Sequence, residues 1–94
     1  LQVPRSPNDL QLRFDYAKIL HDCREWKEAL TQFQLAIHHR KRRIRALIYS
    51  ADIYQKLNQS DHAQEQLETA LTELPNNTRE KTEIENTLQQ LQRG

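Results

Sequence analysis

A basic run at residues 38–45 is the strongest candidate for chemistry in this sequence of 94 residues. It reads HHRKRRIR and holds five Arg or Lys and two His, in a chain whose formal charge at neutral pH is only +1. Clustered guanidinium and ammonium groups bind carboxylate and phosphate oxygens. The basic cluster of Arg40, Lys41, Arg42 and Arg43 therefore predicts either an acidic protein partner or a nucleic acid.

A simpler interpretation of the basic cluster needs no partner. Cations near a helix C-terminus interact favourably with the helix dipole, by about 0.3–1 kcal/mol each when exposed. Two or three residues are enough for that role, and five should repel one another. The chain's own acidic half could balance the rest: residues 1–56 hold eleven Lys or Arg and six Asp or Glu (+5), whereas residues 57–94 hold three and seven (−4).

Catalysis and metal binding find little support among the other reactive side chains. His21 and Cys23 are two residues apart and would project about 200° apart on a helix, which is poor geometry for a dyad or a shared metal. His38 and His39 are adjacent and also diverge, and the only Gly is at the C-terminal end, so there is no Gly-rich phosphate loop. We therefore expect no enzyme activity, no catalytic residue, no metal ligand and no cofactor.

The composition favours helices and argues against membrane insertion. Gly is nearly absent, charged residues make up 29% of the chain, and no apolar run approaches the length of about 18 residues that a membrane span needs. The single cysteine excludes an internal disulfide. We expect a soluble protein, with a cytoplasmic location favoured. Because the chain begins with Leu1, we also expect it to be part of a longer protein.

An internal repeat with a period of 34 residues organises most of the sequence. Displacing the chain by 34 superposes Ala17 on Ala51, Ala29 on Ala63 and Ala36 on Ala70. Such a period is typical of stacked helical units. Within each unit the apolar residues keep helical spacing, which predicts four helices in two antiparallel pairs. The predicted core comprises Tyr16, Ala17, Leu20, Trp26, Ala29, Phe33, Ala36, Ile37, Leu47, Ala51, Tyr54, Ala63, Leu67, Ala70 and Leu71.

Several residues indicate where these helices begin and end. Ser6 before Pro7 is a possible helix start, Asn58 can adopt a left-handed turn, and Ser60 can cap the helix that follows. A fifth helix is predicted at about residues 78–92. It is apolar only at Ile84, Leu88 and Leu91, as a terminal capping helix requires.

The repeat resembles the tetratricopeptide repeat, a helix–turn–helix unit of 34 residues with small and aromatic side chains at fixed positions. The matching residues are Ala17, Leu20, Trp26, Ala29, Phe33 and Ala36 in the first unit, and Ala51, Tyr54, Ala63, Leu67, Ala70 and Pro75 in the second. The resemblance implies an all-α fold of tandem helix–turn–helix repeats in a right-handed superhelix. Its segments would be residues 1–9, resembling the end of a preceding repeat, repeats at 10–43 and 44–77, and a capping helix at 78–94.

The sequence departs from the family pattern mainly at the turns. Arg24 and Asn58 stand where Gly is usual, and Ser60 replaces an aromatic residue. Residues 41–43 align with the Pro-containing turns at residues 7–9 and 75–77, so the basic cluster is predicted to occupy the turn between the two repeats.

The resemblance also implies a site. In tetratricopeptide arrays the first helix of each pair lines a concave groove that takes a peptide or a partner helix. The matching candidates here are Phe14, Lys18, His21, Arg45, Ile48, Asp52 and Gln55, with Gln11, Asp22 and Lys56 beside them. The residue pair that some members use to clamp a C-terminal carboxylate is not matched, since Phe14 and Lys18 occupy those positions. Phe14 and Ile48 could either pack between adjacent first helices or serve as exposed anchors for a partner.

The function predicted from the sequence is a non-catalytic protein–protein interaction module within a larger scaffold or assembly protein. It would hold a partner peptide or helix in its groove. The alternative is nucleic-acid or polyanion binding through residues 40–45. We also expect an apolar edge near Leu12, Tyr16 or Phe14, which upstream repeats of a longer array or a second copy of the chain would cover.

Overall fold

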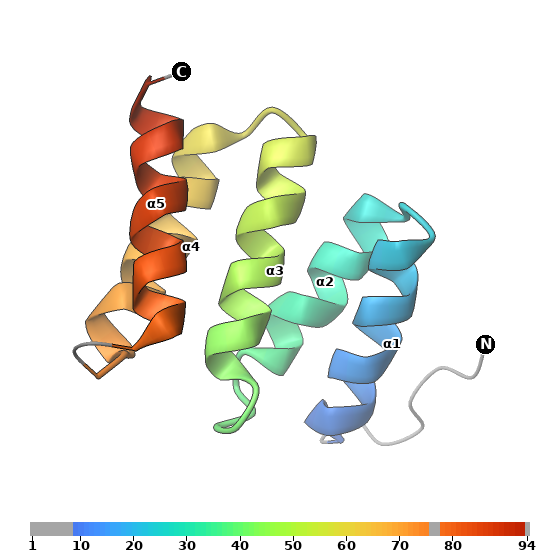
Figure 1. Cartoon of the computed structure of the whole chain (residues 1–94). Helices are drawn as coiled ribbons and strands as arrows, with labels where there is room; N and C mark the ends of the chain where they lie inside the picture. The colour runs from blue at the N-terminus through green and yellow to red at the C-terminus, as the bar shows by residue number, and fades with distance from the viewer. Residues whose placement is uncertain (1–8, 76–77, 94) are drawn as a thin grey trace.

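The computed structural model describes residues 9–75 and 78–93, and these residues form α-helices and no strands. The chain is therefore all-α, as the sequence predicts (Figure 1). The helices, in chain order, are α1 (Leu10–Asp22), α2 (Trp26–Ala36), α3 (Arg43–Lys56), α4 (Ser60–Glu73) and α5 (Arg79–Arg93).

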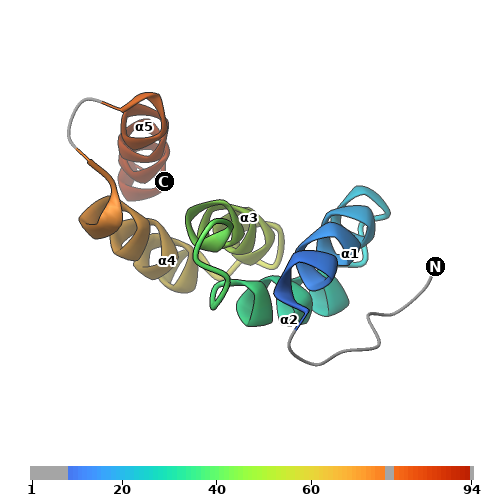
Figure 2. The same ribbon diagram turned by 90° about the horizontal axis from the view of Figure 1, so that it is seen from below.

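Helices adjacent in sequence pack against one another and form two layers. α1 packs against α2, and α3 packs against α4. In addition, α2 packs against α3, and α4 packs against α5. Seen from below, α1, α3 and α5 lie in one layer and α2 and α4 in the other (Figure 2). This arrangement of packed helix pairs is that of an all-α, repeat-like fold.

Alanines allow the helices to approach closely. Ala17, Ala29 and Ala36 in the first pair are fully buried, as are their counterparts 34 residues later, which are at most 1% exposed. A methyl side chain brings two helix backbones together, and larger side chains such as Phe33 and Leu67 fill the space beside the crossing. The predicted alanine positions are confirmed. Five other predicted core residues are only partly buried: Tyr16, Trp26, Ile37, Tyr54 and Leu71.

Helix α3 is more deeply buried than the sequence indicates. Its Ala46, Ser50 and Ile53 are fully buried, although none of them belongs to the predicted stripe. The reason is that α3 packs on α2 as well as on α4, so two of its faces are covered. A helix in the middle of an array buries a wider surface than one at its end.

A small polar network crosses the centre of the array. The Gln34 amide nitrogen of α2 donates to the Ser50 hydroxyl of α3 and to the Gln66 side-chain oxygen of α4, each at 2.9 Å. Ser50 has no solvent exposure, so this bond satisfies a polar group that would otherwise be costly to bury. The three side chains thus connect the first helix pair to the second.

The turns within the two pairs use residues in the left-handed region. Arg24 has φ of 60° and Asn58 has φ of 61°. The prediction for Asn58 is confirmed. Ser60, in contrast, is the first residue of α4 rather than its cap: the cap position is Gln59, which makes no side-chain capping bond. The predicted Ser60 cap is therefore wrong.

Two of the other helix starts, those of α1 and α5, have side-chain caps, whereas those of α2 and α3 have none. At α1 the Asp9 carboxylate accepts the backbone N–H of Leu12 at 3.1 Å, whereas the predicted start at Ser6 and Pro7 lies outside the described residues. At α5 the Thr78 hydroxyl accepts the backbone N–H of Lys81 at 3.2 Å. These bonds satisfy amides that have no partner within their own helix.

Helix α5 covers α4 with a narrow apolar stripe. Ile84 and Leu88 are buried against α4, Leu91 is partly buried, and most other side chains are polar and exposed. Because the stripe is narrow, α5 covers the end of the array without filling the space beside α3.

Candidate functional site

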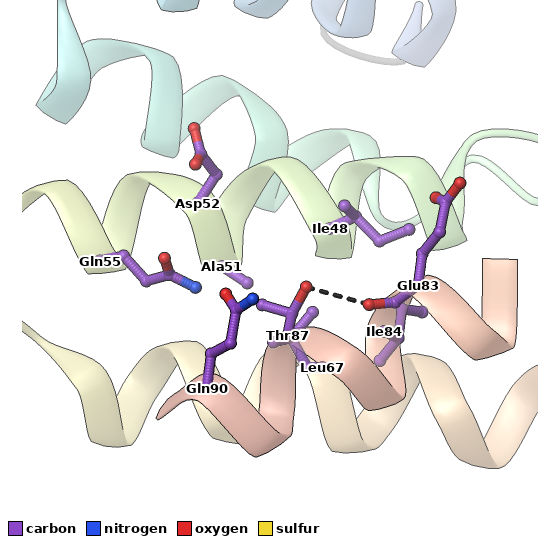
Figure 3. Close-up of a pocket in the computed structure, with 9 residues that line it drawn as sticks. All are labelled: Ile48, Ala51, Asp52, Gln55, Leu67, Glu83, Ile84, Thr87 and Gln90. Carbon is purple, nitrogen blue, oxygen red and sulfur yellow. Dashed lines mark hydrogen bonds between the residues drawn. The ribbon is translucent and has the colours of Figure 1, made fainter. Parts of the chain in front are cut away.

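A pocket of about 280 Å³ lies between α3 and α5 (Figure 3). Three of the candidate residues on α3, namely Ile48, Asp52 and Gln55, line its upper wall. The sequence did not predict the opposite wall, which comes from α5, because the amphipathic pattern of α5 indicates only which face packs on α4. The full lining is Ile48, Ala51, Asp52, Gln55, Leu67, Glu83, Ile84, Thr87 and Gln90.

The pocket has an apolar floor and a polar rim. Ala51, Leu67 and Ile84 belong to the buried core, while Gln55 and Gln90 extend toward each other from opposite walls (Figure 3). Within the described part of the chain, neither amide side chain makes a hydrogen bond to another residue. Both amides can therefore donate to and accept from a ligand.

Thr87 belongs to the pocket but is already bonded. Its hydroxyl donates to the backbone carbonyl of Glu83, one turn earlier on α5, at 3.0 Å (Figure 3). Thr87 therefore contributes mainly the shape of the wall.

A second hollow of about 520 Å³ adjoins the pocket at the other side of Asp52. It brings together the predicted His21 and Asp52 with Asp22 and Lys56, and adds Arg24 and Trp26, which the sequence assigned to the turn and the core. Since Asp52 lines both spaces, the pocket and the hollow are neighbouring parts of one surface that runs over α1, α3 and α5.

A hydrogen bond between His21 of α1 and Asp52 of α3 connects the first helices of the two helix pairs. His21 Nε2 lies 2.7 Å from Asp52 Oδ2. The His21 ring stands edge-on to Trp26 and to Tyr49, with ring centroids 5.2 Å apart in both cases. These contacts fix the ring, so His21 positions Asp52 and helps hold α1 beside α3.

Phe14 is part of the core rather than an exposed anchor. It is 5% exposed and packs edge-on against Phe33 and Tyr49, with centroid separations of 5.7 and 6.0 Å. Of the two roles left open for Phe14, the structure thus supports packing. Lys18 is exposed, with its ammonium 5.8 Å above the Phe14 ring.

Arg45 lies outside the pocket and bridges two helices. Its Nε is 3.7 Å from a carboxylate oxygen of Glu80, at the start of α5. Both side chains are partly exposed, and the pair contributes little to stability. It does bring the N-terminal end of α5 toward α3.

The basic cluster is divided among several partners. Arg42 Nε donates to the Gln11 side chain at 2.9 Å, and its guanidinium lies 5.7 Å above the Phe14 ring. Arg40 and Lys41 are exposed, and no salt bridge within the described residues involves them. The cluster therefore does not present its four cations to one ligand.

Arg43 is the most strongly engaged member of the basic cluster. Its Nε and Nη2 donate to the two carboxylate oxygens of Glu73 at 2.6 and 2.8 Å, and its Nη1 donates to the carbonyl of Ile37 at 3.2 Å. A two-bonded Arg–carboxylate pair of this kind is stronger than a single contact. The acidic half of the chain thus balances part of the basic run, which was one of the explanations left open.

The Arg43–Glu73 pair should make stability depend on pH. The pKa of the Glu73 carboxyl is lowered from its ordinary value of 4.5, first because Arg43 hydrogen-bonds to the ionised form. A lowered pKa contributes stability that is present above about pH 4.5 and is lost as the pH falls through the folded-state value. We expect Glu73→Gln to lower the free energy of unfolding by about 0.5–1 kcal/mol at pH 7.

That difference should be smaller at a pH well below 4.5, because the wild-type carboxyl loses its charge as the pH falls through its lowered folded-state pKa. Urea unfolding followed by circular dichroism at the two pH values measures it. The control is Glu68→Gln on the same helix, whose carboxylate accepts only a 3.4 Å bond from Gln64. Equal effects of the two substitutions at pH 7 would show that the Arg43 pair does not stabilise the fold.

Three further observations concern the described residues. Among them, no group of three or more His, Cys, Asp or Glu side chains is placed to hold a metal ion. None of the helices between residues 9 and 93 is both long and apolar enough to cross a membrane. Cys23 is exposed and follows the last residue of α1, with its thiol free.

Comparison with known proteins gives no match: no family model, no curated protein and no solved structure is significantly similar to this chain. The functional inference therefore depends on the residues and geometry of the chain itself.

Proposed function

We propose that the chain is a non-catalytic interaction module that binds a segment of a partner protein over α3 and α5. The observation that carries the proposal is the pocket between these helices, with its apolar floor and its two amide side chains, Gln55 and Gln90, that have no partner within the described residues. Apolar floors supply affinity, and a few uncommitted polar groups at the rim supply orientation.

The size of the pocket favours a peptide over a small molecule. Pockets for drug-sized ligands usually measure about 300–1,000 Å³, and this one holds about 280 Å³. It is large enough for one side chain, while the adjoining hollow at His21 and Asp52 extends the surface along the array. A peptide or helix that crosses several helices can use both.

The 34-residue period supports a tetratricopeptide-like array as the framework of this module. In such an array the first helices face the ligand, and here α1, α3 and α5 share one layer (Figure 2). Three large apolar side chains on the first helix pair remain exposed, which supports a continuation of the array or a second copy of the chain as their cover: Leu12 (48%), Ile19 (42%) and Leu35 (39%).

Polyanion binding through residues 40–45 has less support. Arg42, Arg43 and Arg45 already contact Gln11, Glu73 and Glu80, so a nucleic acid would have to displace these partners. Only Arg40 and Lys41 of the cluster are exposed and unpaired within the described residues. Two cations can neutralise only about two phosphates, which contributes little to the affinity for a nucleic acid.

The proposal predicts that a bulky residue in the pocket blocks binding. Peptides selected by wild type from a phage-displayed random library should bind Gln90→Arg at least about tenfold more weakly, because the longer side chain fills the space between α3 and α5. The matched control is Gln89→Arg, the neighbouring exposed residue on α5, which adds the same charge outside the pocket. Fluorescence anisotropy measures both affinities. Equal binding by the two variants would contradict the proposal.

A further inference from the structure

We infer that the pocket between α3 and α5 takes a Lys or Arg side chain from a positively charged segment of the partner. This inference rests on the proposed function and names the chemistry of its ligand. It follows from three features of the pocket: the negative charge of its lining, its apolar floor, and its two amide side chains that have no hydrogen-bond partner within the described residues.

The charges that line the pocket are all negative. Asp52 on α3 and Glu83 on α5 contribute carboxylates, and the nine lining residues include no Lys, Arg or His. Figure 3 shows these carboxylates on opposite walls, toward different ends of the pocket. A bound cation would thus find a carboxylate on either helix, whereas a carboxylate ligand would meet two charges of its own sign.

Neither carboxylate is fully neutralised by its own neighbours. Asp52 uses Oδ2 for the bond to His21. Glu83 lies 3.8 Å from Arg79, but that guanidinium is 94% exposed, so water and salt screen this pair. Both groups therefore retain the capacity to accept a charge-assisted hydrogen bond from a ligand.

The floor of the pocket suits the stem of a long basic side chain. Ala51, Leu67 and Ile84 form an apolar surface below the polar rim. Lys and Arg have three or four methylene groups that pack on such a surface while the charged head reaches polar groups at its edge. A short acidic side chain could not cover this floor.

The two amides at the rim match the backbone of the same segment. Gln55 and Gln90 each offer a carbonyl oxygen and an NH₂ group, which can pair with a peptide N–H and C=O. A ligand that places its backbone between these amides can lay one basic side chain on the floor.

The neighbouring hollow carries positive as well as negative side chains, and it is therefore less suitable than the pocket for the basic side chain of the ligand. Besides Asp22 and Asp52, the hollow is lined by Arg24 and Lys56. These cations would oppose a second positive charge there. The ligand is therefore an extended segment whose basic residue lies between α3 and α5, with less charged residues toward α1.

The test combines peptide selection with a matched pair of double variants. Asp52→Asn with Glu83→Gln removes both pocket carboxylates and keeps their shapes, and the new amide oxygen can still accept from His21. Asp15→Asn with Glu85→Gln is the control, because it makes the same substitutions at exposed positions outside the pocket. Wild type and both variants are used to select random dodecapeptides displayed on phage.

We expect peptides selected by wild type to be enriched in Lys or Arg, and the pocket variant to bind them about tenfold more weakly and with a smaller dependence on salt. The control variant should bind them as wild type does. Circular dichroism of each variant checks that it is folded.

The other outcomes separate this inference from the proposed function. Selected peptides that are neutral, apolar or acidic, and whose binding Gln90→Arg abolishes, would overturn the basic ligand and leave the groove as the binding site. Basic peptides that bind both double variants equally would also overturn it. Failure to select any peptide that Gln90→Arg weakens would overturn the proposed function itself.

Discussion

Replacing Phe33 with alanine is expected to lower the free energy of unfolding by about 3–5 kcal/mol, the largest effect of any substitution considered. Phe33 is fully buried on α2. Its ring stacks on Tyr49 of α3, with centroids 4.7 Å apart and planes 3° from parallel, and stands edge-on to Phe14 of α1. The substitution therefore leaves a cavity where three helices meet.

This loss is a large share of the total stability, which for a domain is only about 5–15 kcal/mol. Urea unfolding followed by circular dichroism measures it. Leu35→Ala is the control: Leu35 is on the same helix but is 39% exposed, so its removal should cost less than about 1 kcal/mol. A Phe33→Ala protein as stable as the control would exclude this ring as the centre of the first core cluster.

Enlarging the alanines at the helix crossings should also destabilise the fold, but through overpacking. We expect Ala29→Leu and Ala63→Leu each to lower the free energy of unfolding by about 1–3 kcal/mol. Both alanines have no solvent exposure, one between α1 and α2 and the other between α3 and α4. The added atoms would force the paired helices apart.

The control for this prediction is Glu65→Leu, an exposed position on α4 where the same side chain meets solvent. Because Leu is a good helix former, that variant should be close to wild type in stability. Thermal melting monitored by circular dichroism compares the three variants with wild type. Unchanged melting of both alanine variants would mean that the 34-residue register has been assigned to the wrong face of the helices.

The sequence predicts the helices well because their signals are local. Alanines that recur at a fixed spacing, and the narrow stripe of Ile84 and Leu88, place the apolar faces without any knowledge of the tertiary structure. Side-chain caps are less predictable. Ser60 can cap a helix in principle, yet the chain enters α4 one residue earlier, at Gln59.

The site is less predictable because it depends on pairs of residues far apart in the sequence. Spacing places Ile48, Asp52 and Gln55 on one face of α3 but cannot show that α5 forms the opposite wall. For the same reason the basic run suggested a single binding surface, whereas Arg43 pairs with Glu73, which lies 30 residues later. No local pattern distinguishes a cation that binds a partner from one that pairs within the fold.

The polar network around Gln34 has a consequence for cooperativity. In a linear array, the free energy of the interface between neighbouring units determines whether they melt together or one by one. Separating the two helix pairs would break the bonds from Gln34 to Ser50 and to Gln66, and would expose the surface they cross. The network thus adds to the nearest-neighbour coupling between the pairs. That coupling favours a single unfolding transition for the whole array over independent melting of each pair.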